Sequence, residues 1–101
     1  MAIHNVAAVI LPTTHYLLKL IDPPVRKLID GGVIFALGSN FNPNCYCMSM
    51  PLVMNMACVN LKAKLSETLV GATLNAAFSL CLSETHGSLE NGKFGDMVVI
   101  N

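Results

Sequence analysis

The stretches Val6-Ala7-Ala8-Val9-Ile10-Leu11 and Val33-Ile34-Phe35-Ala36-Leu37 decide the fold of this chain. Both are short and apolar throughout, and each ends at a residue that stops a strand, Pro12 for the first and Gly38 for the second. Runs that are apolar on both faces are typical of strands in a parallel sheet that is covered on both sides. The two stretches therefore predict an α/β fold with parallel, adjacent strands near residues 6–11 and 33–38.

A helix is expected to connect these strands. Pro23 and Pro24 suit the start of a helix over residues 25–30, and Gly31-Gly32 suit its end. A strand, a helix and a second parallel strand form a βαβ unit, whose crossover is right-handed. The residues after each strand, Thr13-Thr14-His15 and Ser39-Asn40, are then expected on the same edge of the sheet.

That edge is where functional residues are expected, because active groups in α/β folds lie at the carboxyl ends of strands. His15 has no second His or carboxylate at a ligand-like spacing, so we expect a surface or helix-start residue there rather than a ligand. Asn40, Asn42 and Asn44 place three amides within five residues. Such a run is typical of a turn, since Asn bonds to its own backbone, but its position at a strand end also suits a binding site.

The remainder of the chain is predicted to be helical up to a turn-rich segment. Pro51 suits a first helical turn, and apolar residues then recur at helical spacing through residue 60. Ser66 and Thr73 are the expected caps of two further helices. Residues 87–96 are rich in turn formers and lead into residues 97–100, which are predicted to form a final strand.

Composition narrows the class of protein. Of 101 residues, 53% are hydrophobic and only 12% are charged, against roughly a quarter in ordinary soluble domains, and the formal net charge is zero. Without a basic cluster we expect no nucleic acid partner. Polar residues and prolines interrupt the uncharged stretch from 31 to 61, and the first residues lack a positive segment, so we expect neither a membrane span nor a secretory signal. One domain in the cytoplasm is the expected setting.

Four cysteines, Cys45, Cys47, Cys58 and Cys81, lie among apolar neighbours without the spacing of a disulfide framework. We expect reduced core thiols. The pair Cys45 and Cys47 could hold a soft metal, but no second pair or matching His motif accompanies it.

Several motifs follow one another in a familiar order. They are Leu11-Pro12-Thr13-Thr14, Gly38-Ser39-Asn40-Phe41-Asn42-Pro43-Asn44, Met54-Asn55-Met56-Ala57-Cys58, Thr73-Leu74-Asn75-Ala76-Ala77 and residues 87–98. Together they closely resemble the C-terminal part of the imidazolonepropionases, metal-dependent hydrolases of histidine degradation in the amidohydrolase superfamily. The resemblance covers essentially the whole chain. The 73–77 and 87–98 motifs are common to many amidohydrolases, whereas Phe41-Asn42-Pro43 is the sharper signal for imidazolonepropionases.

The resemblance implies a fold and a site. It implies the last two strands and helices of a metal-dependent (β/α)8 barrel over residues 1–86, and a return segment into a small β-sandwich domain over residues 87–101. Asn40 stands where the family has an Asp that contacts the catalytic zinc or iron and accepts the proton of the attacking water. Asn42 and Asn44 correspond to the loop that binds the substrate. The other metal ligands lie upstream in the family and are missing from this chain.

Three hypotheses about function remain open at this point. The chain is part of a hydrolase that converts 4-imidazolone-5-propionate to N-formimino-L-glutamate, a small-molecule substrate. Alternatively, it is a non-catalytic remnant that pairs with itself or with a full-length relative, or it belongs to an amidohydrolase of another cyclic amide. An upstream His-x-His motif in the same reading frame would favour the first hypothesis.

The first prediction concerns the isolated chain, which we expect to be a homo-oligomer or poorly soluble. A two-strand piece of a barrel leaves sheet edges and apolar faces uncovered, and few charges oppose association. Sedimentation velocity should show oligomers whose share increases with concentration. A compact monomer with a cooperative thermal transition would contradict this prediction.

Overall fold

The computed structural model describes residues 4–100 and contains the predicted pair of parallel strands. Strand β1 (Ala8–Ile10) pairs with strand β2 (Phe35–Leu37), with Ala8 opposite Phe35 and Ile10 opposite Leu37. Bonds just outside the strands extend the ladder: the Ala8 N–H donates to the Ile34 carbonyl at 2.8 Å, and the Gly38 N–H donates to the Ile10 carbonyl at 3.0 Å. The predicted α/β pairing is confirmed, although both strands are shorter than expected.

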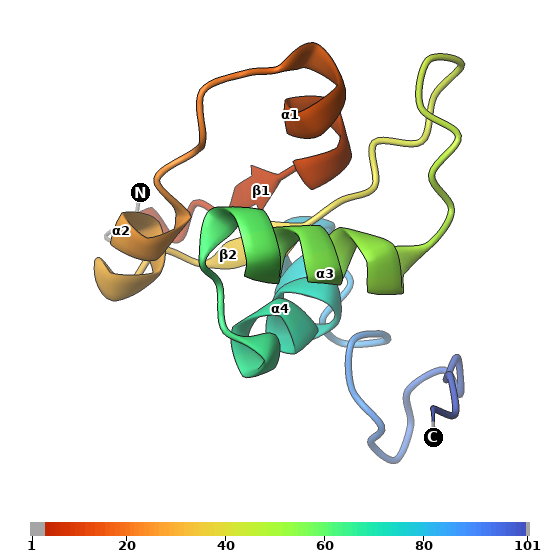
Figure 1. Ribbon diagram of the computed structural model, residues 1–101. Helices are drawn as coiled ribbons and strands as arrows, with labels where there is room; N and C mark the ends of the chain where they lie inside the picture. The colour runs from red at the N-terminus through yellow and green to blue at the C-terminus, as the bar shows by residue number, and fades with distance from the viewer. Residues whose placement is uncertain (1–3, 101) are drawn as a thin grey trace.

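Five helices surround this sheet: α1 (Pro12–Leu18), α2 (Val25–Asp30), α3 (Met50–Leu61), α4 (Leu65–Ala72) and α5 (Leu74–Ser79). In Figure 1, α3 passes in front of the strands, α4 lies below it, and α1 lies above the sheet. The loop between β2 and α3 extends away from the body of the fold, and the segment after α5 lies apart at the lower right. The helices leave part of this small sheet uncovered.

The crossover helix α2 begins and ends where the sequence predicts. Pro24 precedes its first residue, Val25, which is only 1% exposed and belongs to the core. The helix ends at Gly31, and Gly32 follows with φ of +71°, a conformation that glycine adopts without a Cβ clash. Turn chemistry at both ends therefore sets the length of the crossover.

Helix α1 extends over more residues than the sequence analysis predicted, which expected a helix start only at His15. Pro12 does end the first strand, but it is also the first residue of a helix, a position where its fixed φ and missing N–H are favourable. The helix stops at Lys19, which adopts a left-handed conformation. Thr13, Thr14 and His15 consequently lie in the first turns of a helix rather than in a loop.

The core fills the space between β2 and the helices that cover it. Helix α3 contributes Val53, Ala57 and Leu61, spaced by four so that they share one face. Ser49 caps this helix, its hydroxyl accepting from the Leu52 N–H at 3.4 Å. The buried cluster consists of Val25, Phe35, Leu37, Val53, Ala57, Leu61 and Ala63. The helix predicted from residue 49 onward is confirmed.

The caps predicted for the next two helices are wrong in detail. Helix α4 begins at Leu65, so Ser66 lies inside it, and the Glu67 carboxylate accepts instead from the Lys64 N–H at 2.7 Å. Thr73 is the N-cap residue of α5, as predicted, but its hydroxyl donates back to the Leu69 carbonyl at 2.7 Å and makes no side-chain cap hydrogen bond. Thr73 is the one residue between α4 and α5, and its hydroxyl bonds to the preceding helix rather than to the first turn of the next.

The predicted strand over residues 97–100 is also wrong. These residues have no regular structure, and their side chains are 62–91% exposed. A strand forms only when a neighbour accepts and donates its backbone hydrogen bonds. Residues 4–100 offer no strand beside this segment.

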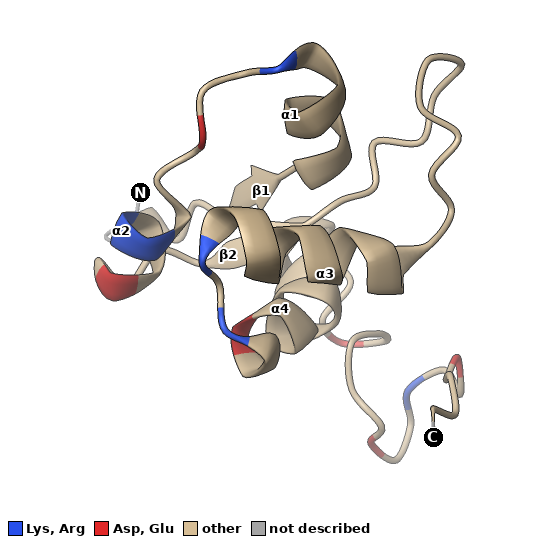
Figure 2. Cartoon of the chain, in the orientation of Figure 1, with Lys and Arg blue, Asp and Glu red and all other residues tan. Residues whose placement is uncertain are grey.

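Charge is sparse and unevenly placed on the chain. Figure 2 shows Lys, Arg, Asp and Glu near α2, around the start of α4 and in the C-terminal segment, while the long loop after β2 and most of α3 carry none. Within residues 4–100 no helix has the length and apolar character needed to cross a bilayer.

One ion pair connects the crossover helix to α4. The Arg26 guanidinium donates to both oxygens of Glu67, at 2.8 and 2.9 Å, and also to Asp30 on its own helix. A bidentate pair of this kind is stronger than a single charged hydrogen bond. The guanidinium, together with the Lys64 backbone N–H, lowers the pKa of the Glu67 carboxyl to about 2. The same contacts, with Glu67 first and Asp30 second, raise the pKa of Arg26.

This pair yields a prediction about acid stability. Because the pKa of folded Glu67 is about 2, below its ordinary value of 4.5, the pair contributes stability above about pH 4.5 and loses it as the pH falls toward 2. The Glu67→Gln variant should melt at a lower temperature than the parent chain at pH 7, and this gap should close between pH 4.5 and 2. Circular dichroism melts at matched protein concentrations would measure both values. Glu84→Gln, at an exposed position, is the control and should not differ from the parent chain.

Candidate functional site

The carboxyl ends of β1 and β2 meet at one edge of the sheet, as the sequence predicts. The Thr13 hydroxyl donates to the Ser39 carbonyl at 2.7 Å, and the Asn40 amide Nδ2 donates to the Thr14 hydroxyl at 2.6 Å. These two bonds join segments 26 residues apart in the sequence. The start of α1 and the exit from β2 therefore form one polar surface.

Asn40 is the exposed residue of this surface, and its backbone is left-handed, with φ of +50°. Among residues other than glycine, Asn and Asp enter this conformation most readily. The left-handed turn directs the chain away from the sheet into the loop of residues 41–49. One Nδ2 hydrogen is bonded to Thr14, so Asn40 offers a ligand its carboxamide oxygen and its second Nδ2 hydrogen.

The other two candidate amides lie in a tight turn that follows Asn40. Asn42 donates from Nδ2 to the Asn40 carbonyl, and its Oδ1 accepts from the Asn44 N–H at 2.9 Å. Asn42 and Cys45 also exchange backbone hydrogen bonds, at 3.1 and 2.9 Å. Both halves of the Asn42 amide thus serve the turn, which confirms the turn interpretation of the amide run. The exposed Asn44 contributes its backbone N–H to the turn.

Aromatic residues flank this turn. The rings of Phe41 and Tyr46 meet edge to face, with centroids 5.7 Å apart and an interplanar angle of 77°. Both side chains are exposed, at 53% and 75%. The pair closes the base of the loop and places apolar surface next to the amides.

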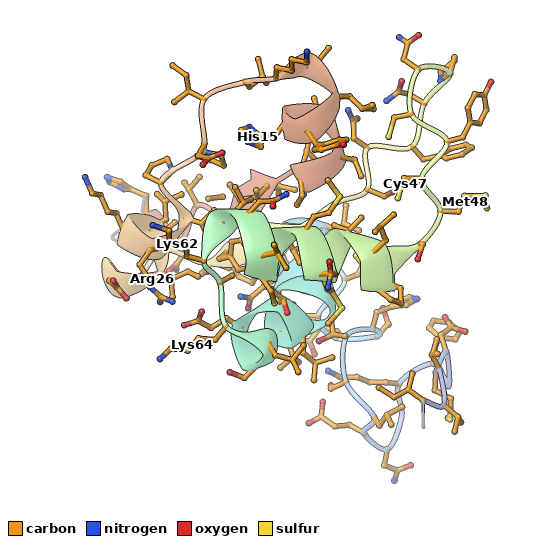
Figure 3. The ribbon with its side chains drawn as sticks, in the orientation of Figure 1. His15, Arg26, Cys47, Met48, Lys62 and Lys64 are labelled. Carbon is orange, nitrogen blue, oxygen red and sulfur yellow. The ribbon has the colours of Figure 1, made fainter. Side chains whose placement is uncertain are left out.

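His15 lies apart from the amides and has a partner that the sequence analysis missed. Its Nε2 lies 2.6 Å from the Asp22 carboxylate, and the His15 side chain is 14% exposed against 70% for Asp22. Figure 3 shows His15 projecting from the inner side of α1, toward the connection that leads to α2. A groove of about 600 Å³ borders the pair, and Tyr16, Lys19 and Asn60 are among its other lining residues. The expectation of a helix-start residue is confirmed, but the carboxylate seven residues later gives it a tertiary contact.

The cysteines are free, as expected, but they are not all core residues. Cys45 is buried, Cys47 and Cys58 are partly buried, and Cys81 is exposed, which contradicts the prediction for Cys81. Cys81 lies beyond the end of α5, where its backbone has φ of +59°. Cys47 and Met48 lie on the outer loop in Figure 3, where the Cys47 thiol donates to the Ser49 carbonyl at 3.8 Å.

The strand-end surface supplies neutral groups. Over residues 4–100, no three His, Cys, Asp or Glu side chains come together in a way that could hold a metal ion. Thr13, Thr14 and Asn40 offer hydroxyls and an amide, which can position a polar ligand but cannot accept a proton at neutral pH. These residues can orient a substrate, and the chemistry of bond cleavage needs groups beyond them.

Comparison with known proteins identifies the fold family. The family model described as "Amidohydrolase family" matches residues 21–101. The chain belongs to the amidohydrolase family. The matched residues include β2, the amide turn and all of α3 to α5, so the polar surface at the strand ends lies within the amidohydrolase match on its β2 side.

Individual relatives resemble the whole chain. It is 56% identical over 101 residues to "Probable imidazolonepropionase" of Homo sapiens, which covers all of this chain and 24% of the relative. It is 60% identical over 97 residues to the protein of the same name from Nematostella vectensis, covering 96% of this chain and 23% of that relative. The chain therefore spans about a quarter of the length of the curated relatives it matches. The resemblance noted in the sequence is confirmed.

Membership in this family points to a TIM-barrel type of fold. The two parallel strands and their crossover helix are consistent with a piece of such an architecture. The assignment of residues 1–86 to a barrel and of 87–101 to a β-sandwich domain stays a prediction.

The turn itself can be tested through the buried thiol beside it. Asn42→Ala removes two side-chain hydrogen bonds of the turn, so the Cys45 thiol should open to solvent more often and react with iodoacetamide about tenfold faster. Mass spectrometry of the digested chain would give the rate at each cysteine, and exposed Cys81 would serve as an internal reference. Asn44→Ala keeps the backbone N–H that the turn uses and should leave the Cys45 rate unchanged. Equal rates in both variants would show that the Asn42 amide does not hold the turn.

Proposed function

We propose that this chain is part of an imidazolonepropionase, a hydrolase of histidine degradation. In the proposed reaction, water attacks the ring carbonyl carbon of 4-imidazolone-5-propionate and the ring carbon–nitrogen bond breaks. The departing nitrogen takes a proton, and N-formimino-L-glutamate is released. A cytoplasmic location and a small-molecule substrate accompany this proposal.

The observation that carries the proposal is the extent of the similarity. Relatives from Homo sapiens and Nematostella vectensis, both named "Probable imidazolonepropionase", match nearly every residue of the chain at 56–60% identity. The match includes the Phe41-Asn42-Pro43 turn, which the resemblance assigns to this activity rather than to amidohydrolases in general. Because the terminal motifs are shared more widely, hydrolysis of a different cyclic amide is the alternative within the same family.

The site residues have distinct roles in this proposal. Asn42 holds the turn, and Asn44 presents its exposed amide to the propionate or the ring of the substrate. Asn40 occupies the position at which the resemblance implies a carboxylate. Its free carboxamide oxygen can accept a hydrogen bond from substrate or water, but it cannot act as the general base.

The metal in this proposal is implied by the family, and the residues of this chain alone do not indicate one. Amidohydrolases are generally metal-dependent, and zinc or iron is the metal that the resemblance implies. Residues 4–100 bring no three suitable side chains together, and Asn40 is neutral, so these residues do not form a metal site by themselves. The remaining ligands would have to come from other parts of a complete enzyme.

Asn40 also supports a second candidate function, a non-catalytic relative. A hydrolase of this kind needs a base for the proton of the attacking water, and Asn40 replaces the residue that the resemblance assigns to that task. A protein with the same fold and this substitution would still bind an imidazolone but turn it over slowly. The two candidate functions predict different effects on turnover when a carboxylate is introduced at position 40.

We expect Asn40→Asp to restore the base. The experiment uses a chimera in which this chain replaces the matching quarter of the Homo sapiens relative. Asn40→Asp should raise kcat for imidazolone propionate by at least about a hundredfold, because general-base assistance is typically worth 10² to 10⁴ in rate. The backbone favours this exchange, since Asp tolerates the left-handed φ at position 40 almost as well as Asn.

Asn91→Asp adds the same charge in the exposed C-terminal segment and is the matched control, which should leave kcat unchanged. Equal turnover by the unmodified and Asn40→Asp chimeras at saturating zinc or iron would show that position 40 does not hold the base. A chimera that stays inactive with Asp at position 40, while the unmodified relative is active, would favour the non-catalytic candidate.

A further inference from the structure

The chain contains one Asn-Gly pair, Asn91-Gly92, and both of its residues are exposed. They are the central residues of a turn that the Lys93 N–H closes by donating to the Glu90 carbonyl at 3.2 Å. The Lys93 ammonium also lies 2.8 Å from the Glu90 carboxylate, so the two ends of the turn are held together. In Figure 1 the segment that carries this turn lies apart from the sheet and the helices.

The two central residues of this turn are little restrained. Gly92 has φ of +90°, and no atom beyond the adjoining residues lies within 4 Å of the position that a Cβ would take there. Among the hydrogen bonds of residues 4–100, none involves the Asn91 carboxamide or the Gly92 N–H. The Asn91 side chain and the backbone nitrogen that follows it are therefore accessible to each other and to water.

The pair Asp30-Gly31, at the end of α2, is held in the opposite way. The Gly31 N–H donates to the Lys27 carbonyl at 3.0 Å, and the Asp30 carboxylate accepts from the Arg26 guanidinium at 3.0 Å. A reaction between a side chain and the next backbone nitrogen requires that both leave such contacts. The structure therefore restrains position 30 and leaves position 91 free to react.

We propose that Asn91 is a site of spontaneous modification, at which its carboxamide is converted to a carboxylate. The Gly92 nitrogen attacks Asn91 Cγ and closes a succinimide ring. The carboxamide nitrogen leaves as ammonia and takes up the proton that the Gly92 nitrogen gives up. Glycine at the second position favours this attack, because it has no Cβ to hinder ring closure.

Water then opens the ring in one of two ways. Addition at Cγ breaks the bond between Cγ and the Gly92 nitrogen and leaves Asp at position 91. Addition at the main-chain carbonyl carbon of Asn91 breaks the bond between that carbon and the Gly92 nitrogen. The product is then isoaspartate, whose side-chain carbons have become part of the backbone. Water is the only co-reactant, and no group is oxidised or reduced.

Both products change the C-terminal segment. Each conversion adds one negative charge to a chain whose formal net charge is zero. Isoaspartate also lengthens the backbone between Glu90 and Lys93, so the hydrogen bond that closes the turn loses its geometry. The next contacts follow directly: the Phe94 N–H donates to the Thr85 carbonyl at 3.0 Å, and the Phe94 ring lies 5.0 Å from the His86 ring. We therefore expect isoaspartate to loosen residues 93–96.

The test is to incubate the purified full chain at neutral pH and to follow each Asn by peptide mapping with mass spectrometry. Asn91 should convert to Asp and isoaspartate at least about tenfold faster than the exposed Asn40 and Asn44, which no glycine follows. Gly92→Ala should slow the conversion by at least about tenfold, because its Cβ hinders the attack. Isoelectric focusing should show an acidic form that accumulates in the parent chain and not in Asn91→Gln.

Asp30→Asn is the matched control, because it creates a second Asn-Gly pair at the restrained position. In the folded chain it should convert at least about tenfold more slowly than Asn91, since Gly31 donates to a helix carbonyl. In urea that unfolds the chain, the two rates should become similar. Circular dichroism establishes that the variant folds. If it does not, the comparison of Asn91 with Asn40 and Asn44 decides alone.

Three results would overturn the proposal. The first is an Asn91 that stays intact, and the second is conversion at Asn40 or Asn44 at the same rate. The third is equal conversion at positions 30 and 91 in a folded Asp30→Asn chain, which would show that the exposed turn does not select the site. The proposal does not involve hydrolysis of imidazolone propionate, so either can fail without the other.

Discussion

The parallel hydrogen bonds between β1 and β2 are the constraint on which the rest of the structure depends. Parallel pairing requires a crossover, so α2 must pass across the sheet between the two strands. The same pairing places β2 against α4 and α5, and Phe35 and Leu37 join the buried cluster. It also fixes the exits of both strands on one edge, which is why Thr14 and Asn40 meet although 26 residues separate them. The register of the β1–β2 pair therefore determines the position of both the core and the site.

At the site, conformation and chemistry make separate demands on position 40. The left-handed backbone favours residues such as Gly, Asn and Asp at this position, and Asn meets that preference. Nothing in that geometry distinguishes the amide from the carboxylate. The difference lies in charge and proton affinity, since the amide can donate to Thr14 and a carboxylate can only accept, from the Thr14 hydroxyl. In the proposed reaction, Asn at position 40 would therefore preserve the fold and lack the function of a base.

The sequence predicts those parts of the fold that follow from local patterns. Apolar runs predicted the strands, proline and glycine predicted the ends of α2, and helical spacing of apolar residues predicted α3. Each of these signals acts within one segment. The missed features depend on context. Pro12 both ends a strand and begins a helix, and only the tertiary structure shows that it does both. The His15 and Asp22 contact crosses the end of α1, so no periodic pattern relates the two residues.

The failed strand over residues 97–100 has the same origin. Its sequence is apolar and rich in β-branched residues, which favours a strand. Strand pairing needs a second segment, however, and the described residues contain no strand that pairs with this one. Of the candidate site, the sequence predicted the shared edge and the turn, because parallel topology and asparagine chemistry are both readable in a single chain. It could not predict that both halves of the Asn42 amide are used within the turn.

The motifs shared across the amidohydrolase family have structural roles in the C-terminal half of the chain. Asn75 of the 73–77 motif secures α5 to the Phe35 carbonyl, and a Cβ at Gly71 would lie 2.9 Å from the Phe35 ring, so only glycine allows α4 to approach the strand so closely. Gly87 opens the last motif with φ of +96°, and a Cβ there would lie 2.8 Å from Ala77. Gly71 and Asn75 thus hold α4 and α5 against β2, and Gly87 allows the returning chain to approach α5 closely. Motifs of this kind therefore concern the scaffold, whereas the proposed reaction depends on the turn from Asn40 to Asn44.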